Sequence, residues 1–276
     1  MNKLSLVLLL FICFNLKAQN KTDTSVYLCK YSFEWQKDTA NMFSKSNDLM
    51  YLEIGKNSSI FYSYYRFLGF RNLSEDLKMR KSLDYIKSNY SRYYQNSETE
   101  IIIHNFGKKE FKVIDKLTGN GVTYCYLDSV KTPVWTLAKD TLTILNHLCQ
   151  MATTTFKGRD YIAWFAPDIP ISIGPWQYTG LPGLILRIHD TKNQIWFEAT
   201  ELGSTTASDA AEIEYPNCLQ VAKSKLRELK RIQAEDRLAF EKMQNPNLTI
   251  TYRNSSGEII QPPHKLKPYN PIDLSK

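Results

Sequence analysis

A short apolar segment rich in proline and glycine separates two strand-like runs near the middle of this 276-residue chain. Residues 164–175 read WFAPDIPISIGP, and residues 180–185 read GLPGLI. Proline fixes φ and lacks a backbone donor, whereas glycine allows positive φ. Most loops are polar and exposed to water, so a loop this apolar predicts a shaped structure folded against a sheet.

The rest of the chain is dominated by short β-like runs with turn residues at regular intervals. Runs at 48–54 and 60–67 flank a Gly-Lys-Asn-Ser-Ser turn and predict a hairpin. Further strands are expected between residues 101 and 199, with an Asn-Gly turn at 118–121. The 17 tyrosines and 13 phenylalanines favour broad pleated surfaces. This spacing predicts antiparallel pairing and excludes a series of β-α-β units.

Two segments depart from this rhythm and predict helices. Residues 74–89 begin at Ser74, a good N-cap, and keep a roughly helical apolar spacing, which indicates an amphipathic helix or an insertion. Residues 218–243 form a charged amphipathic stretch. We therefore expect an α+β fold. Its parts are a curved antiparallel sheet (a meander like an open barrel), helices packed on one face, and the Pro/Gly-rich apolar loop.

The N-terminus predicts export. Lys3 precedes an apolar run, Leu4–Phe14, that is too short to span a bilayer, and Ala18 suits a cleavage site. Residues 1–18 are thus predicted to be a removed signal peptide, which places the product in the periplasm or at the cell surface. Lipidation at Cys13 is disfavoured because the preceding Ile12 is large. No later apolar run approaches the roughly 18 residues that cross a membrane.

The mature chain is expected to form a single β-rich domain over residues 19–248. An irregular tail with several prolines follows at 249–276. The formal net charge is +7, but acids and bases alternate along the chain, so no stripe for nucleic acid is present. We predict no nucleic-acid partner and no transmembrane segment after signal removal.

Motifs for catalysis are missing from the sequence. There is no Gly-x-Ser-x-Gly elbow, no His-Glu-x-x-His pair and no phosphate-binding loop, and the four histidines are scattered. We predict that the protein is not an enzyme and has no metal and no cofactor. The mature cysteines, Cys29, Cys125, Cys149 and Cys218, allow three full pairings. A Cys125–Cys149 disulfide between neighbouring strands and four buried thiols are both compatible with the pattern.

Arg159 and Trp164 are the polar and aromatic residues of most interest beside the loop. Arg159 lies in a predicted turn before the strand 161–165, where it can stack on Trp164, bond loop carbonyls, or remain an exposed turn residue. Aromatic residues near the loop either pack the core or line an apolar groove. The candidate ligand- or partner-binding residues are Arg159, Trp164, Pro170, Gly174, Pro175, Gly180, Leu181, Pro182, Gly183 and Leu184.

These motifs resemble a known family. The run ATTTFKGRDYIAWF at 152–165, followed by Ile-Pro, Gly-Pro and GLPGLIL, resembles the signature of the GLPGLI family. The resemblance implies an exported Bacteroidetes protein and carries over no catalytic residue. The layout is also similar to periplasmic lipoprotein carriers, which hold acyl chains in a curved antiparallel sheet covered by helices. That likeness is at the level of the fold.

Two functions follow as hypotheses. The first is binding of an apolar ligand, a lipid or a lipoprotein acyl chain, in an aromatic-lined groove near Trp164 and Leu181. The second is a structural or interaction subunit of a cell-envelope assembly that docks a protein partner through the Pro/Gly loop. A hydrolase is the weakest hypothesis, because no nucleophile–base pair can be named.

Overall fold

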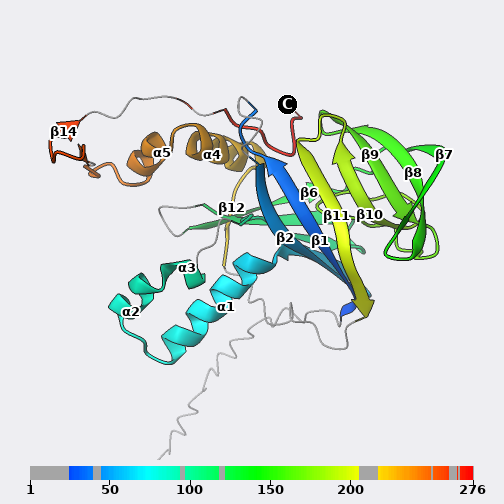
Figure 1. Cartoon of the computed structure of the whole chain (residues 1–276), viewed down its shortest axis with the longest axis horizontal. Coiled ribbons are helices and arrows are strands. Elements are labelled where there is room, and N and C mark those ends of the chain that lie inside the picture. The colour runs from blue at the N-terminus through cyan, green and yellow to red at the C-terminus, as the bar shows by residue number, and fades with distance from the viewer. Residues whose placement is uncertain are drawn as a thin grey trace, which may run out of the picture.

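The computed structural model describes residues 25–39, 45–93, 97–117, 122–204, 217–249, 251–260, 266 and 268–275 (Figure 1). The predicted signal peptide, residues 1–18, and the predicted Asn-Gly turn at 118–121 lie outside the described residues. Within the described part, no helix has both the length and the apolar character needed to cross a bilayer.

One 12-stranded sheet makes up most of the structure, and its order is β12-β6-β5-β4-β3-β2-β1-β11-β10-β9-β8-β7. All neighbours are antiparallel except β12 and β6, which are parallel. The strands are β1 (Ser25–Gln36), β2 (Lys45–Gly55), β3 (Ser58–Ser63), β4 (Ile101–Asn105), β5 (Glu110–Lys116), β6 (Thr123–Ser129), β7 (Thr136–Ile144), β8 (His147–Phe156), β9 (Arg159–Ala166), β10 (Leu184–Asp190), β11 (Ile195–Ser204) and β12 (Leu219–Gln220). A separate pair joins β13 (Tyr252–Arg253) and β14 (Ile259–Ile260).

The first strand joins the two halves of the sheet. β1 pairs with β2 on one side and with β11 on the other, so it links the β2–β6 meander to the β7–β11 meander. The rings of Phe33 on β1 and Phe197 on β11 stack with centroids 4.3 Å apart. Residues from β5 and β8, far apart in the strand order, belong to the same core cluster, so the sheet curves around one core. The predicted curved antiparallel sheet is confirmed.

The described residues form five helices, and these lie on both faces of the sheet. They are α1 (Tyr64–Lys78), α2 (Leu83–Ser88), α3 (Tyr90–Tyr93), α4 (Lys223–Glu235) and α5 (Arg237–Gln244). Leu226 and Leu229 of α4 join the main core, together with Leu52 of β2. Tyr51, the residue before Leu52 on β2, points to the opposite face and stacks on Tyr64 of α1. The expected placement of all helices on one face is therefore corrected, because successive strand residues face opposite sides and both sides of β2 are apolar.

The first helix begins earlier than the sequence suggested. The aromatic run 60–67 predicts a strand throughout, yet the strand stops at Ser63 and α1 follows. The Ser63 hydroxyl accepts a hydrogen bond from the Arg66 amide and donates one to the Asp48 carboxylate, 3.0 Å away. This N-cap outweighs the strand preference of the aromatic residues that follow. The predicted hairpin before it, β2 to β3, is confirmed.

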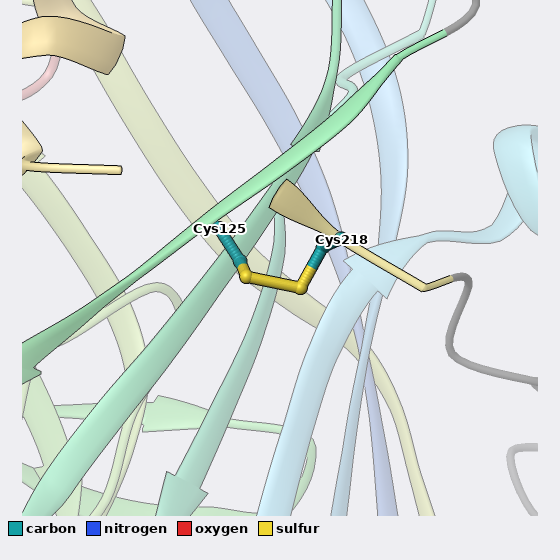
Figure 2. The surroundings of a disulfide bond; sticks show 2 residues. All are labelled: Cys125 and Cys218. Atoms are coloured by element: carbon teal, nitrogen blue, oxygen red, sulfur yellow. A yellow bond between two sulfur atoms is a disulfide. The ribbon is translucent and has the colours of Figure 1, made fainter. Parts of the chain in front are cut away.

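A single disulfide is present among the described cysteines, and it joins Cys125 to Cys218 (Figure 2). It ties β6 to the residue that precedes β12, with the two Cα atoms 5.6 Å apart. The Cys125–Cys149 pairing considered from the sequence is wrong. Cys149 lies on β8, which pairs with β7 and β9 and not with β6. Cys149 and Cys29 are buried free thiols.

The disulfide predicts a large contribution to stability. It closes a loop with a sequence separation of 93 residues, and loops of that length give about 4.6 kcal/mol in the chain-entropy account. A Cys125→Ala/Cys218→Ala variant should therefore unfold at lower urea concentration than the wild type. Reductant should lower the wild-type midpoint and leave the variant unchanged. A wild-type midpoint that is insensitive to reductant would contradict the pairing.

Candidate functional site

The Pro/Gly loop, residues 167–183, lies against the end of the sheet between β9 and β10. Two backbone bonds tie the first half of the loop to the start of β10: the Leu184 amide donates to the Ile169 carbonyl at 3.0 Å, and the Ile185 amide donates to the Ile173 carbonyl at 3.0 Å. A Cβ atom at Gly183 would collide with the Ala166 carbonyl oxygen, so only glycine fits there. The loop is thus a fixed part of the fold, as the sequence predicted.

The buried side of the loop belongs to the aromatic core. Tyr178 is fully buried and lies 5.0 Å from Tyr161 and 5.3 Å from Trp176, measured between ring centroids. Leu181 and Leu184 are buried with them. These apolar side chains therefore fill space and are closed to a ligand.

The exposed side of the loop forms one wall of an open apolar groove of about 430 Å³. The opposite wall comes from the ends of β1, β2 and β4. The lining residues are Tyr27, Ile54, Gly55, His104, Phe106, Pro170, Ile171, Ser172 and Ile173.

His104 is the basic side chain among the residues that line this groove. Its ring packs against Phe106 at 4.9 Å and Phe111 at 4.5 Å between centroids. Its Nδ1 atom is buried without a hydrogen-bond partner among the described residues. Burial lowers the pKa of His104 to about 4, so the imidazole is neutral at pH 7 and adds an uncharged aromatic wall.

The ten residues predicted as a site do not gather at this groove. Pro170 lines it. Gly180 and Pro182 are exposed elsewhere on the loop, and Trp164 is half-buried on β9. The remaining members are buried in the fold: Arg159, Gly174, Pro175, Leu181, Gly183 and Leu184. The sheet residues of the groove were missed, because their approach to the loop depends on long-range topology.

Arg159 forms a buried node that joins three segments. It begins β9 and does not lie in a turn, and its guanidinium pairs with the Asp190 carboxylate at 3.0 Å. The same group donates to the Pro271 carbonyl at 2.7 Å and to the Asn270 side-chain oxygen. Trp35 donates its indole N–H to the Asn270 carbonyl at 2.8 Å. This node ties the C-terminal tail to the sheet, and its partners are not carbonyls of the Pro/Gly loop.

A second polar cluster, which the sequence did not reveal, lies beside the tail. Lys223 of α4 contacts Asp128 at 2.6 Å and Asp273 at 3.2 Å, and Lys157 lies 3.7 Å from both carboxylates. Burial, together with the Lys223 charge, lowers the pKa of Lys157 to about 8. The cluster connects β6, the β8–β9 turn, α4 and the tail, so it bridges strands that share no backbone hydrogen bonds.

A small cavity of about 50 Å³ adjoins this cluster. Its lining includes Trp35, Glu98, Glu100, Tyr126, Trp176, Lys230 and Tyr269. Lys230 pairs with Glu100 at 2.7 Å and with Asp115 at 2.9 Å. Burial raises the pKa of Glu98 to about 7. The cavity has room for water but not for a substrate. We therefore assign its charged residues to the side-chain contacts that stabilise the fold, and not to a binding site.

A comparison with known families matches one stretch of the chain. A Bacteroidetes-associated family model described as "Protein of unknown function (Porph_ging)" matches residues 156–187. This stretch runs from the end of β8 through β9 and the Pro/Gly loop into β10. No curated protein matches the chain.

Among solved structures, PNGF-II in its P21 and C2 crystal forms is similar to this chain. The TM-scores are 0.51 and 0.50 at 13% and 14% sequence identity. Each match covers 74% of this chain and 32% of the PNGF-II chain, so the chain spans about a third of that protein's length. At such identity the likeness shows the fold alone. An uncharacterized conserved protein from Thermus thermophilus aligns at a TM-score of 0.37 and 9% identity, over 72% of this chain and 91% of that chain, and carries no argument.

The Arg159 node predicts a large loss of stability when the cation is removed. Arg159→Met leaves the buried Asp190 carboxylate without its counter-ion, which costs about 3–5 kcal/mol. Urea denaturation should show this loss, and limited proteolysis should cut the tail near residues 268–275 sooner. The exposed pair partner Arg231 provides the control: Arg231→Met should cost less than about 1 kcal/mol. Equal losses in the two variants would contradict the role of the node.

Glu98 predicts a pH-dependent stability. Its folded pKa, about 7, lies above its ordinary value of 4.5, so the folded state holds the proton more tightly. The contribution of Glu98 to the free energy of unfolding is fully present below pH 4.5. It is lost as the pH rises through 7, by on the order of 1–3 kcal/mol. The difference in unfolding free energy between Glu98→Gln and wild type should change across this range. Glu201→Gln, at an exposed position, should follow the wild type. A Glu98→Gln curve parallel to wild type would contradict the raised pKa.

Proposed function

We propose that this chain is an exported, non-catalytic GLPGLI family protein that binds an apolar ligand, a lipid or acyl chain. The binding site is the groove between the Pro/Gly loop and the ends of β1, β2 and β4. The observation that carries the proposal is the groove itself. Its volume of about 430 Å³ lies within the roughly 300–1,000 Å³ of small-molecule sites, and apolar residues dominate its lining.

The loop supports this role by its rigidity. Backbone bonds tie Ile169 and Ile173 to β10, so the wall between them, with Pro170 and Ile171, exists before a ligand arrives. A preformed apolar wall reduces the ordering cost of binding. The family assignment rests on the GLPGLI motif, and the matched segment 156–187 contains that motif. Export rests on the predicted signal peptide.

A binding role suits the polar groups of the groove better than catalysis does. The Ser172 hydroxyl accepts a hydrogen bond from the Gly180 amide at 3.1 Å. The neutral His104 ring packs between phenylalanines. No hydrogen bond joins these two side chains in the described contacts, whereas a nucleophile needs a base within hydrogen-bond reach.

The test is probe binding with groove variants. Wild-type protein should enhance the fluorescence of N-phenyl-1-naphthylamine, and hexadecanoic acid should displace the probe. Phe106→Ser/Ile171→Ser should weaken both ligands about tenfold or more, because each lost apolar contact contributes about 1 kcal/mol.

Two controls make this test specific. Leu148→Ser alters an exposed leucine on β8 and should leave binding unchanged. Trp164→Ala alters an aromatic residue that does not line the groove, and it should also leave binding unchanged. Probe binding that survives Phe106→Ser/Ile171→Ser, or that depends on Trp164, would contradict this site.

The alternative function is docking of a cell-envelope protein through the Pro/Gly loop. It is favoured by the exposed apolar Val134, which neighbours Trp135. Trp135 donates its indole N–H to the Thr179 carbonyl at 2.8 Å, which places this segment against the loop. A photo-crosslinking residue at Pro182 should then capture one envelope protein in the native host. Crosslinking no greater than at an exposed β8 position would count against this alternative.

A further inference from the structure

The helices α1, α2 and α3 form a projection that extends from one side of the sheet (Figure 1). The start of α1 packs on the sheet, where Phe67 meets Tyr62 with ring centroids 5.7 Å apart. The far end is held by contacts within the projection: Tyr93 donates its hydroxyl to Asp76 at 2.7 Å, and Arg92 pairs with Asp76 at 3.3 Å. We call residues 77–92 the helical tip. It is an ordered part of the projection.

The helical tip exposes an unusual number of large apolar side chains. Met79 is 68% exposed and Leu83 is 71% exposed. Three further residues complete the group: Leu77, Tyr85 and Tyr90. Isolated exposed apolar residues are normal on protein surfaces, but here five fall within residues 77–90, and a concentration of this kind is typical of interaction sites.

The same tip is strongly basic. It carries one acid, Asp84, and five basic residues: Lys78, Arg80, Lys81, Lys87 and Arg92. The first four of these are exposed, and none forms an ion pair with a described residue. Arg231 of α4 and Arg237 of α5 differ from these four, because each pairs with a glutamate on its own helix.

The tip thus combines exposed apolar side chains with four cations that have no carboxylate partner among the described residues, and Lys81 lies over the Tyr85 ring. This combination fits one partner best, which is an anionic lipid surface. Apolar side chains of a surface helix enter the boundary between headgroups and acyl chains, while lysine and arginine contact anionic headgroups. Tyrosine favours the same interface. No residue of the tip lines either cavity described above, and the tip protrudes from the sheet (Figure 1).

We propose that the helical tip binds the surface of an anionic membrane through Met79 and Leu83, with its lysines and arginines on the lipid headgroups. This role is distinct from ligand binding in the groove, and either can fail without the other.

Vesicle co-sedimentation of the whole protein tests this proposal. The probes are vesicles of phosphatidylcholine alone and vesicles in which about a third of the lipid is phosphatidylglycerol. The protein should bind the anionic vesicles more tightly, and added salt should weaken that binding. Met79→Ser/Leu83→Ser and Lys81→Glu/Lys87→Glu should each reduce the binding about tenfold or more. Every variant carries the same N-terminus, so the differences report on the tip.

Matched controls separate the tip from general surface effects. Leu137→Ser/Leu148→Ser removes two similarly exposed leucines from β7 and β8 and should bind like wild type. Lys225→Glu/Lys242→Glu makes the same change in net charge on α4 and α5 and should also bind like wild type. Equal binding to neutral vesicles, or equal loss in the control variants, overturns the proposal. Self-association that Met79→Ser/Leu83→Ser abolishes, without vesicle binding, overturns it and assigns the tip to a second copy of the chain.

Discussion

The buried ion pair between Arg159 and Asp190 is the interaction on which the rest of the structure depends. The two residues stand at the same end of the β9–β10 pair, and Asp190 also accepts hydrogen bonds from the amides of Gln194 and Ile195. The Asp190 carboxylate therefore fixes the turn between β10 and β11. Its partner Arg159 holds the tail through Asn270. Both charges are almost fully buried, so each needs the other to offset the cost of leaving water.

The Pro/Gly loop is fixed at the opposite end of the β9–β10 pair. Ala166 pairs with Leu184 where the loop leaves and rejoins the sheet. Buried Leu181 and Tyr178 anchor the loop from below, which leaves the segment from Pro170 to Ile173 to face the groove. The same loop thus has a structural side and a surface side. That division explains why a motif this apolar does not simply join the core.

The sheet is open, because its edge strands β12 and β7 do not pair with each other. Contacts other than strand pairing must therefore hold these two edges together. Side chains span the gap instead. Lys157 and Lys223 share Asp128 and Asp273, and these residues come from β6, α4, the β8–β9 turn and the tail. The Cys125–Cys218 disulfide holds β12 beside β6 in the same region of the sheet. The ionic contacts do here what strand pairing does in a closed barrel, whereas the disulfide strengthens one edge.

Local features of the fold could be predicted from the sequence, whereas contacts between distant segments could not. The β2–β3 hairpin and the Pro/Gly loop were predicted, because turn residues and strand propensity act over a few positions. The helix after Ser63 was missed, because its cap depends on Asp48, 15 residues earlier. The groove was also missed because it depends on contacts between distant segments. Phe106 and Ile171 line the same groove only after the sheet has brought the end of β4 beside the Pro/Gly loop. The one local sign of the groove in the sequence is the spacing of His104, on β4, and Phe106, just after it, because alternate residues of an extended segment face the same side.

The central claim is that the groove holds an apolar molecule. Native mass spectrometry of the protein recovered from its own host tests that claim directly. We predict a discrete mass above that of the polypeptide, which organic extraction removes and which is missing from Phe106→Ser/Ile171→Ser. A mass equal to that of the polypeptide alone, unchanged when lipids from the host are added back, would contradict it.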